Sequence, residues 1–316
     1  MFQLKHYPTP IAGLTLGIFG ITNFWANLIA NTVISNIVLV LLSLVGLSLL
    51  IPLLLKFIRY PRFLLTDLQH PTVGSVLPTL AMSLMYLSHT ISLFSQSFAI
   101  GLWFFAIILH FFFFSVFCIH RAKGRDFHHH LVPSWFVPPI GMVVACLTLP
   151  SPSLLPVTHV IVAFGITVYA IMLPVVIYRL SVGKLIEEAR KPTLAILAAP
   201  ASLTLAGYIT VVADPSPLIV MSLFGIAVLM TVSVYLMLAH LLRLPFTPAY
   251  SAFTFPLAVS ATALLKMRLW SHSVPLFEKY GHGFFIASLI EGLIASVMIA
   301  YVYQHYVRFL TQKVKE

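Results

Sequence analysis

The sequence predicts an all-α integral membrane protein, and two observations lead to that fold class. Of its 316 residues, 60% are hydrophobic and only 8% are charged, whereas a soluble domain carries about 25% charged residues. Apolar runs of about twenty residues, the length that crosses the bilayer core as a helix, recur from one end of the chain to the other. We therefore expect a single transmembrane domain over residues 1–316, without a sizeable soluble domain.

Reading the apolar runs between charged or turn-rich breaks gives ten candidate spans. They lie at about residues 9–29, 33–56, 73–92, 97–119, 134–150, 155–178, 194–212, 216–240, 247–266 and 283–305. With this even count, only Lys266, Arg268 and Lys279 of the 18 Lys and Arg fall on the side opposite the N-terminus. Because positive residues collect on the cytoplasmic side, we expect a multi-pass protein of the plasma membrane with both termini in the cytoplasm.

Two series of residues repeat along the chain with a period of about sixty. Prolines stand at the start of the odd-numbered spans, and arginines follow the even-numbered ones. The prolines are Pro10, Pro71, Pro133, Pro192 and Pro248, and the arginines are Arg59, Arg121, Arg179, Arg243 and Arg308. The repeating unit is thus a helical hairpin, present five times at about 8–60, 70–122, 132–182, 191–243 and 247–309.

The hairpin repeat predicts a central path through the molecule. A hairpin returns the chain to its starting side, so that successive units are related by an axis along the membrane normal. The odd-numbered spans are the expected inner ring, because they carry the interruptions Pro78, Pro139, Pro200 and Pro256, with Gly17 at the comparable place in the first span. Lipid does not tolerate such breaks unless protein or water satisfies the freed backbone groups. The even-numbered spans are expected to face lipid.

The predicted inner spans contain no Lys, Arg, Asp or Glu at membrane depth. A path lined by them is neutral, so it cannot select ions by a charged ring. Backbone N–H groups and helix dipoles at the breaks would still favour anions. The cytoplasmic Lys and Arg would add a positive field at one mouth, although the same residues also explain the topology alone.

Residue patterns that carry chemistry are scarce, which argues against an enzyme and against a bound cofactor or metal. The sequence has no HExxH, GxSxG or phosphate-binding glycine loop. The His128–His130 triplet could bind a metal but follows a basic stretch typical of a solvated loop. The net charge of +10 is distributed as topology requires, so no nucleic-acid partner is expected.

Glu291 is the one acid well inside a predicted span. A carboxylate in a membrane is a candidate functional group by default. Two interpretations stay open: Glu291 couples a proton to transport, or it pairs with a neighbouring helix or lies near the outer interface.

Five segments together carry a resemblance to a known family. They are Pro10–Gly17, His70–Pro78, Pro133–Pro139, Lys191–Ser202 and Phe253–Leu257. In this order and spacing they resemble the tellurite-resistance/dicarboxylate transporter (TDT) family, whose relatives include plant slow anion channels and yeast malate and sulfite transporters. Some bacterial sequences similar to this one carry an "exfoliative toxin" label.

The resemblance implies ten helices as five hairpins in a quasi-fivefold arrangement around a pore, commonly as a homotrimer. It also implies a phenylalanine that plugs the pore opposite a glycine-rich first helix. The matching position is Phe255, with Phe253 as the second candidate. Helical positions two apart point about 200° away from each other, so only one of the two can face the axis. Gly13 and Gly17 would give the ring room.

The expected function is therefore an anion channel occluded by Phe255 and shaped by Gly13, Gly17, Pro78, Pro139, Pro200 and Pro256. Its expected partners are the lipid bilayer and small inorganic or dicarboxylate anions. One alternative is a secondary carrier, with or without proton coupling, for malate or another C4-dicarboxylate, tellurite or sulfite. Another is a membrane toxin or peptidase, but no Ser-His-Asp arrangement supports it. A neutral path does not name the permeant anion.

Overall fold

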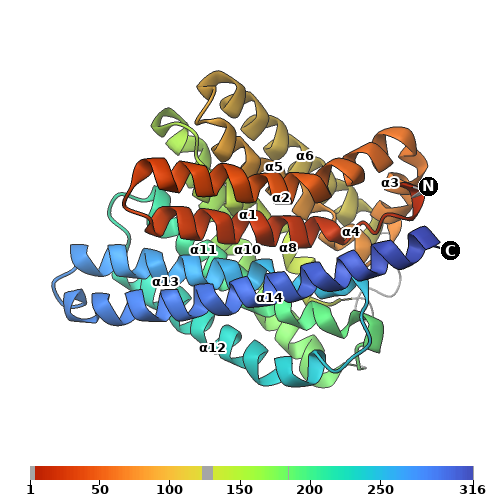
Figure 1. The fold of residues 1–316 in the computed structure, drawn as a ribbon. Helices are drawn as coiled ribbons and strands as arrows, with labels where there is room; N and C mark the ends of the chain where they lie inside the picture. Colours follow the sequence, from red (N-terminus) through yellow and green to blue (C-terminus); the bar gives the residue numbers. More distant parts are fainter. Residues whose placement is uncertain (1–3, 123–130, 184, 316) are drawn as a thin grey trace.

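The computed structural model describes residues 4–122, 131–183 and 185–315, and these residues fold almost entirely into helices (Figure 1). The main α-helices are α1 (Ile11–Leu28), α2 (Thr32–Arg59), α5 (Pro78–Ile91), α6 (Gln96–Ala122), α10 (Leu155–Val182), α11 (Ala199–Val211), α12 (Pro217–Leu241), α13 (Phe255–Ser273) and α14 (Gly281–Lys315). Shorter pieces connect or precede them: η1 (Leu4–His6), α3 (Pro61–Gln69), α4 (Val73–Val76), η2 (Pro133–Phe136), α8 (Val137–Ile140), η3 (Gly141–Val143), α9 (Val144–Leu147), η4 (Pro152–Leu154), η5 (Glu188–Ala198), η6 (Pro248–Phe253) and η7 (Glu278–Tyr280).

Within the described ranges, eight helical segments are long and apolar enough to cross a membrane. They are Ile11–Leu28, Thr32–Arg59, Gln96–Ala122, Pro152–Val182, Glu188–Val211, Pro217–Leu241, Pro248–Ser273 and Glu278–Gln312. The spans predicted at 73–92 and 134–150 are helical too, but the first is divided into α4 and α5 and the second is the short series Pro133–Leu147. Prolines interrupt both, since a proline nitrogen has no hydrogen to donate to the preceding turn.

The internal prolines of the odd-numbered segments each stand in the first turn of an α-helix. Pro78 begins α5, Pro200 is the second residue of α11, and Pro256 is the second residue of α13. Pro139 stands in α8 next to Pro138. Proline is well suited to a first turn, where an N–H would have no intrahelical partner. Each odd-numbered segment after the first therefore has a break, after which an α-helix starts inside the protein.

Burial separates the odd-numbered segments from the even-numbered ones. In an apolar stretch of 18 residues from each segment, 83% of the residues are buried in Ile11–Leu28 and 78% in Glu188–Val211, but only 28% in Gln96–Ala122. The exposed face of α6 is apolar and includes Phe105, Phe111 and Phe112. The even-numbered segments thus form the outside of the bundle, with a surface suited to lipid.

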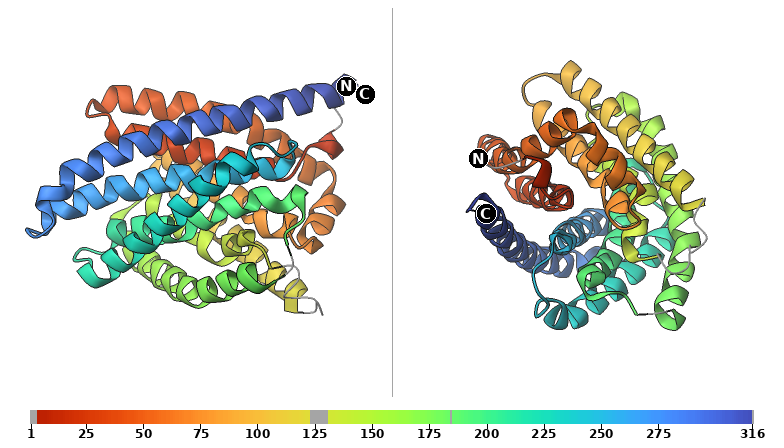
Figure 2. Two further views of the ribbon diagram at one scale, coloured as in Figure 1. Left: turned by 90° about the horizontal axis from the view of Figure 1, so that it is seen from below. Right: turned by 90° about the vertical axis from the view of Figure 1, so that its right-hand side faces the viewer.

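The buried segments contact one another in a cyclic order. α1 packs against α5 and α13, α11 packs against α9 and α13, and α5 packs against α9. Each of them also packs against the outer helix that follows it in sequence, as α1 does with α2 and α13 with α14. Seen end-on in Figure 2, the chain runs around the bundle until the last hairpin returns beside the first. The two ends of the chain lie at the same end of the molecule (Figure 1).

Candidate functional site

A cavity of about 350 Å³ lies among the N-terminal ends of the buried segments. Its walls come from all of these segments, through residues within 10–16, 70–82, 136–141, 189–203 and 247–256. Most of the wall is apolar, and hydroxyl groups of Thr72, Thr193 and Ser251 interrupt it. The cavity is large enough for a small organic ion or for several inorganic ions with water.

The aromatic ring of Phe255 forms part of the wall of this cavity. The cavity wall extends along α1 as far as Leu16 and along α5 as far as Met82. Phe255 lines the cavity, and its ring lies edge-on to Tyr86, one turn beyond Met82, with the ring centroids 6.4 Å apart. It also lies against Gly20, where an added Cβ would be 3.2 Å from the Phe255 Cδ2 atom. Only 6% of Phe255 is exposed, so little space remains around the ring.

Phe253 occupies a different environment from Phe255. It is fully buried and packs against the ring of Tyr250, with the centroids 5.0 Å apart, and it does not line the cavity. The two rings therefore point to different places, as their spacing of two residues requires. Phe255 therefore contacts the cavity, whereas Phe253 packs within the protein beside it.

The other residues predicted to shape the path divide into two groups. Gly13, Pro200 and Pro256 line the cavity. Gly17 instead packs against Thr254, whose Cβ would lie 2.5 Å from a Cβ added at Gly17. Pro78 and Pro139 are buried but do not line the cavity.

The resemblance placed the phenylalanine of the last hairpin opposite the first helix, but the particular hydrogen bond that joins the two hairpins was not foreseen. The Thr254 hydroxyl donates a hydrogen bond of 3.0 Å to the Gly13 carbonyl, which ties α1 to the residue before Phe255. Gly20 and Tyr86 were also missed. Gly20 stands three residues after Gly17 and so shares its helix face, which was an available signal. Tyr86 had none.

The fold and cavity can now be compared with known proteins. Residues 6–302 match the family described as voltage-dependent anion channel. The chain belongs to this family. Two proteins of Methanocaldococcus jannaschii, both named as uncharacterized transporters, are similar to it: one is 28% identical over 65% of this chain and 67% of its own length, and the other 27% identical over 73% and 74%.

Membership of the voltage-dependent anion channel family confirms the resemblance to slow anion channels. It establishes a multi-pass membrane protein whose general role is anion transport or conduction. The family and the names of the relatives indicate transport rather than catalysis. Among the described residues, no group of three or more His, Cys, Asp or Glu side chains is arranged to hold a metal ion, and His128–His130 lie outside those residues.

The mouth of the cavity in this anion channel family member carries a positive side chain. Arg190 lines the cavity from η5, and it is the one Lys, Arg, Asp or Glu among the described wall residues. His70 lines it as well; its Nδ1 accepts hydrogen bonds from the backbone N–H groups of Thr72 and Val73 and so caps the start of α4. The sequence placed Arg190 among the cytoplasmic cations expected to add a positive field at one mouth, but it did not single out Arg190 as a residue of the cavity wall.

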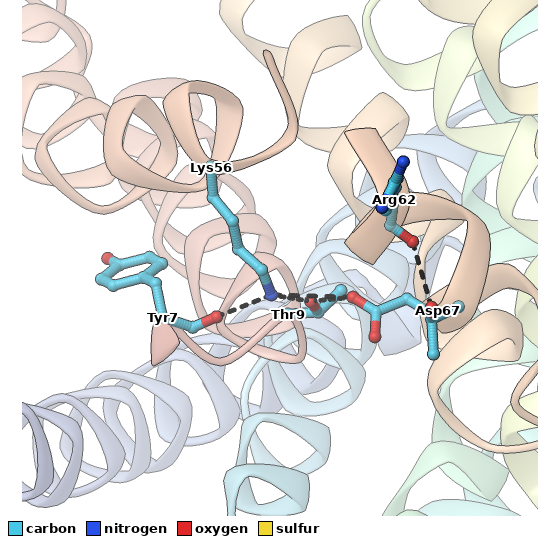
Figure 3. Close-up of polar contacts among 6 residues, drawn as sticks. Tyr7, Thr9, Lys56, Arg62 and Asp67 are labelled. Carbon is cyan, nitrogen blue, oxygen red and sulfur yellow. Dashed lines mark hydrogen bonds and ion pairs between the residues drawn. The ribbon is translucent and has the colours of Figure 1, made fainter. Parts of the chain in front are cut away.

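A buried lysine holds the start of α1 at the rim of the cavity (Figure 3). Lys56, at the end of α2, donates hydrogen bonds of 2.9 Å to the Tyr7 carbonyl and to the Thr9 hydroxyl. Its Nζ lies 3.7 Å from Asp67 Oδ2, and Thr9 donates to the same carboxylate. Because Pro10 follows directly and lines the cavity, this network fixes α1, α2 and α3 relative to the mouth.

His110 shows how one proline break is satisfied. This fully buried side chain of α6 lies with Nε2 2.8 Å from the Pro138 carbonyl. At a proline break a side chain from a neighbouring helix can satisfy backbone groups, and here a side chain of the outer helix contacts a carbonyl of the broken segment. His110 thus joins the outer helix α6 to the broken segment that contains α8.

Glu291 lies away from the cavity. It is 93% buried, its exposed fraction being 7%, and Tyr235 on α12 donates a hydrogen bond of 2.6 Å to Oε2. Glu291 lines a separate pocket between α11, α12, α13 and α14. The structure therefore shows Glu291 paired with a neighbouring helix, and it places the carboxylate beside the cavity rather than in it.

Proposed function

We propose that the chain conducts anions along the axis of its buried segments and that the Phe255 ring occludes this route. In this proposal the single transmembrane domain spans the membrane ten times, as five hairpins in a quasi-fivefold arrangement. The observation that supports it is the position of Phe255, which lines a cavity with walls from all the buried segments and lies edge-on to Tyr86. The cyclic contacts of those segments support the arrangement.

The chemistry of the wall favours anions through fixed dipoles. The helices α11 and α13 both start at the cavity, where Ala199, Pro200, Phe255 and Pro256 form part of its wall. The N-terminal end of a helix carries partial positive charge and N–H groups without intrahelical partners. Arg190 adds a full positive charge at the mouth. With an otherwise apolar wall, this arrangement would suit weakly hydrated anions, which lose their water at lower cost.

A secondary carrier is the second candidate, and the size of the cavity favours it. A volume of about 350 Å³ would accommodate a C4-dicarboxylate such as malate. In that case anion flux would saturate at a low turnover rate. The Phe255 ring would move once in each transport cycle, after an anion has bound in the cavity. Tellurite and sulfite are further candidate anions for such a carrier. A channel would instead pass steady current along the anion gradient.

Replacing the occluding ring tests the proposal. We expect Phe255→Ala to raise anion current in planar bilayers several-fold or more, because the ring is the part of the wall that closes the path. Phe253→Ala is the matched control: it removes a ring of the same size two residues away, and we expect no such increase. An increase with Phe253→Ala alone would show that the wrong ring was chosen, and no increase with either would reject this gate.

The permeant anion is then accessible in the same preparation. With Phe255→Ala to provide current, one anion at a time is exchanged across the bilayer and the reversal potential is measured. A reversal potential that follows the anion gradient supports a channel. Saturating, electrically silent exchange of dicarboxylate supports the carrier.

We further propose that three copies assemble in the plasma membrane with one path each and with the termini in the cytoplasm. The position of both chain ends at one end of the molecule supports a common side for them. The homotrimer rests on the family resemblance. Cross-linking of the protein in its native membrane would test it, since dimers alone would contradict a trimer.

A further inference from the structure

A second pocket, of about 180 Å³, lies between α11, α12, α13 and α14. It shares no wall residue with the cavity that Phe255 lines. Glu291 lines it from α14, ten residues after Gly281, which corresponds to about 15 Å along the helix. Because the hydrocarbon core is about 30 Å thick, the carboxyl group belongs to the interior of the membrane.

One oxygen of this carboxyl group has no hydrogen-bond partner among the described residues. Tyr235 donates to Oε2, whereas Oε1 is buried without a hydrogen bond. The other polar groups of the pocket are the hydroxyls of Ser202, Thr231 and Ser260, and its remaining wall is apolar. An unpaired, buried carboxylate oxygen is unfavourable in a medium of low polarity, which indicates that a ligand binds there.

The charges around the pocket identify that ligand. Tyr235 of α12 is the other titratable side chain in the described wall; α11 and α13 contribute none, and α13 carries its nearest cation, Lys266, outside the wall. α1 also packs against α14, through Phe24 beside Gly292 and through the Trp25 hydrogen bond to Ser296, again without a titratable group. Because the described wall offers no cation to pair with Glu291, a proton is the ligand that neutralises it and gives Oε1 a hydrogen to donate into the pocket.

The pocket is connected to the occluding ring through one turn of α13. The Ser260 hydroxyl donates a hydrogen bond of 2.9 Å to the Pro256 carbonyl. Ser260 also lies 3.2 Å from both Ser202 and Thr231. Pro256 follows Phe255 directly, and both residues line the cavity. Ser260 thus joins the wall of the pocket to the break at which Phe255 lies.

We propose that Glu291 is a proton-binding site beside the anion route and that its occupancy regulates the α13 break carrying Phe255. On binding, an O–H bond forms between a proton from water and Oε1, and the carboxylate becomes a neutral carboxylic acid; release reverses this step. The proton does not accompany the anion, because Glu291 does not line the cavity. The regulatory part rests on the proposed function, whereas the proton site does not.

Infrared difference spectroscopy tests the proton site without any transport. On acidification of the protein in lipid, we expect a protonated-carboxyl band that is lost in Glu291→Gln and shifted in Tyr235→Phe. Glu278→Gln, which alters an exposed acid, is the control and keeps the band. Identical spectra for the protein and Glu291→Gln would overturn the site. The proton site would also be overturned if sodium stabilised the protein at constant pH and Glu291→Gln abolished this effect. The ligand would then be a metal cation.

Anion current as a function of pH tests the regulation. We expect Glu291→Gln to lose the pH dependence of the current while a proton gradient leaves the reversal potential unchanged. A reversal potential that follows the proton gradient would overturn the claim that the proton and the anion do not move together. If even Phe255→Ala passes no anions, the proposed function and the regulation fail, and the infrared result still decides the proton site.

Discussion

At the scale of single residues, the charges show most clearly what the sequence allowed. The scarcity of Lys, Arg, Asp and Glu predicted a neutral inner wall, and the described wall of the cavity carries one of them, Arg190. Its position could not be predicted, because it depends on the way η5 turns toward the axis. The choice of Phe255 came from the family resemblance, and nothing in the 25 phenylalanines themselves distinguishes it.

Arg190 is expected to concentrate anions at the mouth. A positive charge beside a low-dielectric wall raises the local anion concentration, and this effect weakens with salt. Arg190→Gln, measured in the Phe255→Ala background, should therefore lower the current several-fold at low salt and less at high salt. Arg59→Gln removes an exposed charge outside the cavity wall and should change the current little. Equal effects of the two variants would remove Arg190 from the route.

At the scale of elements, the internal prolines were the most informative residues. They located the breaks at which α5, α11 and α13 begin. They did not reveal that Pro133–Leu147 forms four short helical pieces, which alternate between 3-10 and α-helix around the adjacent Pro138 and Pro139. The pocket of Glu291 was also beyond prediction, because it depends on which faces of α12 and α14 meet.

The packing of α1 against the last hairpin predicts an asymmetry between two glycines. A Cβ at Gly17 would lie 2.5 Å from Thr254 Cβ, so Gly17→Ala should destabilise the protein by about 1–3 kcal/mol through overpacking. Gly101, in α6, has no atom within 4 Å of an added Cβ. Gly101→Ala should be neutral or stabilising by up to about 1 kcal/mol. Thermal unfolding in detergent compares the two, and equal unfolding temperatures would contradict the tight contact.

At the scale of the whole molecule, the topology follows from the even number of proposed crossings and from the positive residues. A reporter domain that is active only in the cytoplasm should be active when fused to either the N- or the C-terminus, and one that is active only outside should be inactive at both. A reporter inserted after Phe277, in the connection before α14, should behave in the opposite way. If the two termini report opposite sides, the proposed ten crossings are wrong.

The cyclic order of the buried segments also has a consequence for biosynthesis. The hydrogen bond from Thr254 to the Gly13 carbonyl joins residues 241 positions apart, so the ribosome has completed most of the chain before this contact can form. Until the last hairpin enters the membrane, the bundle lacks both one of its walls and the ring of Phe255. A nascent chain therefore acquires the proposed seal only when its last hairpin is made, and a product truncated before residue 247 would leave uncovered the face of α1 that packs against α13.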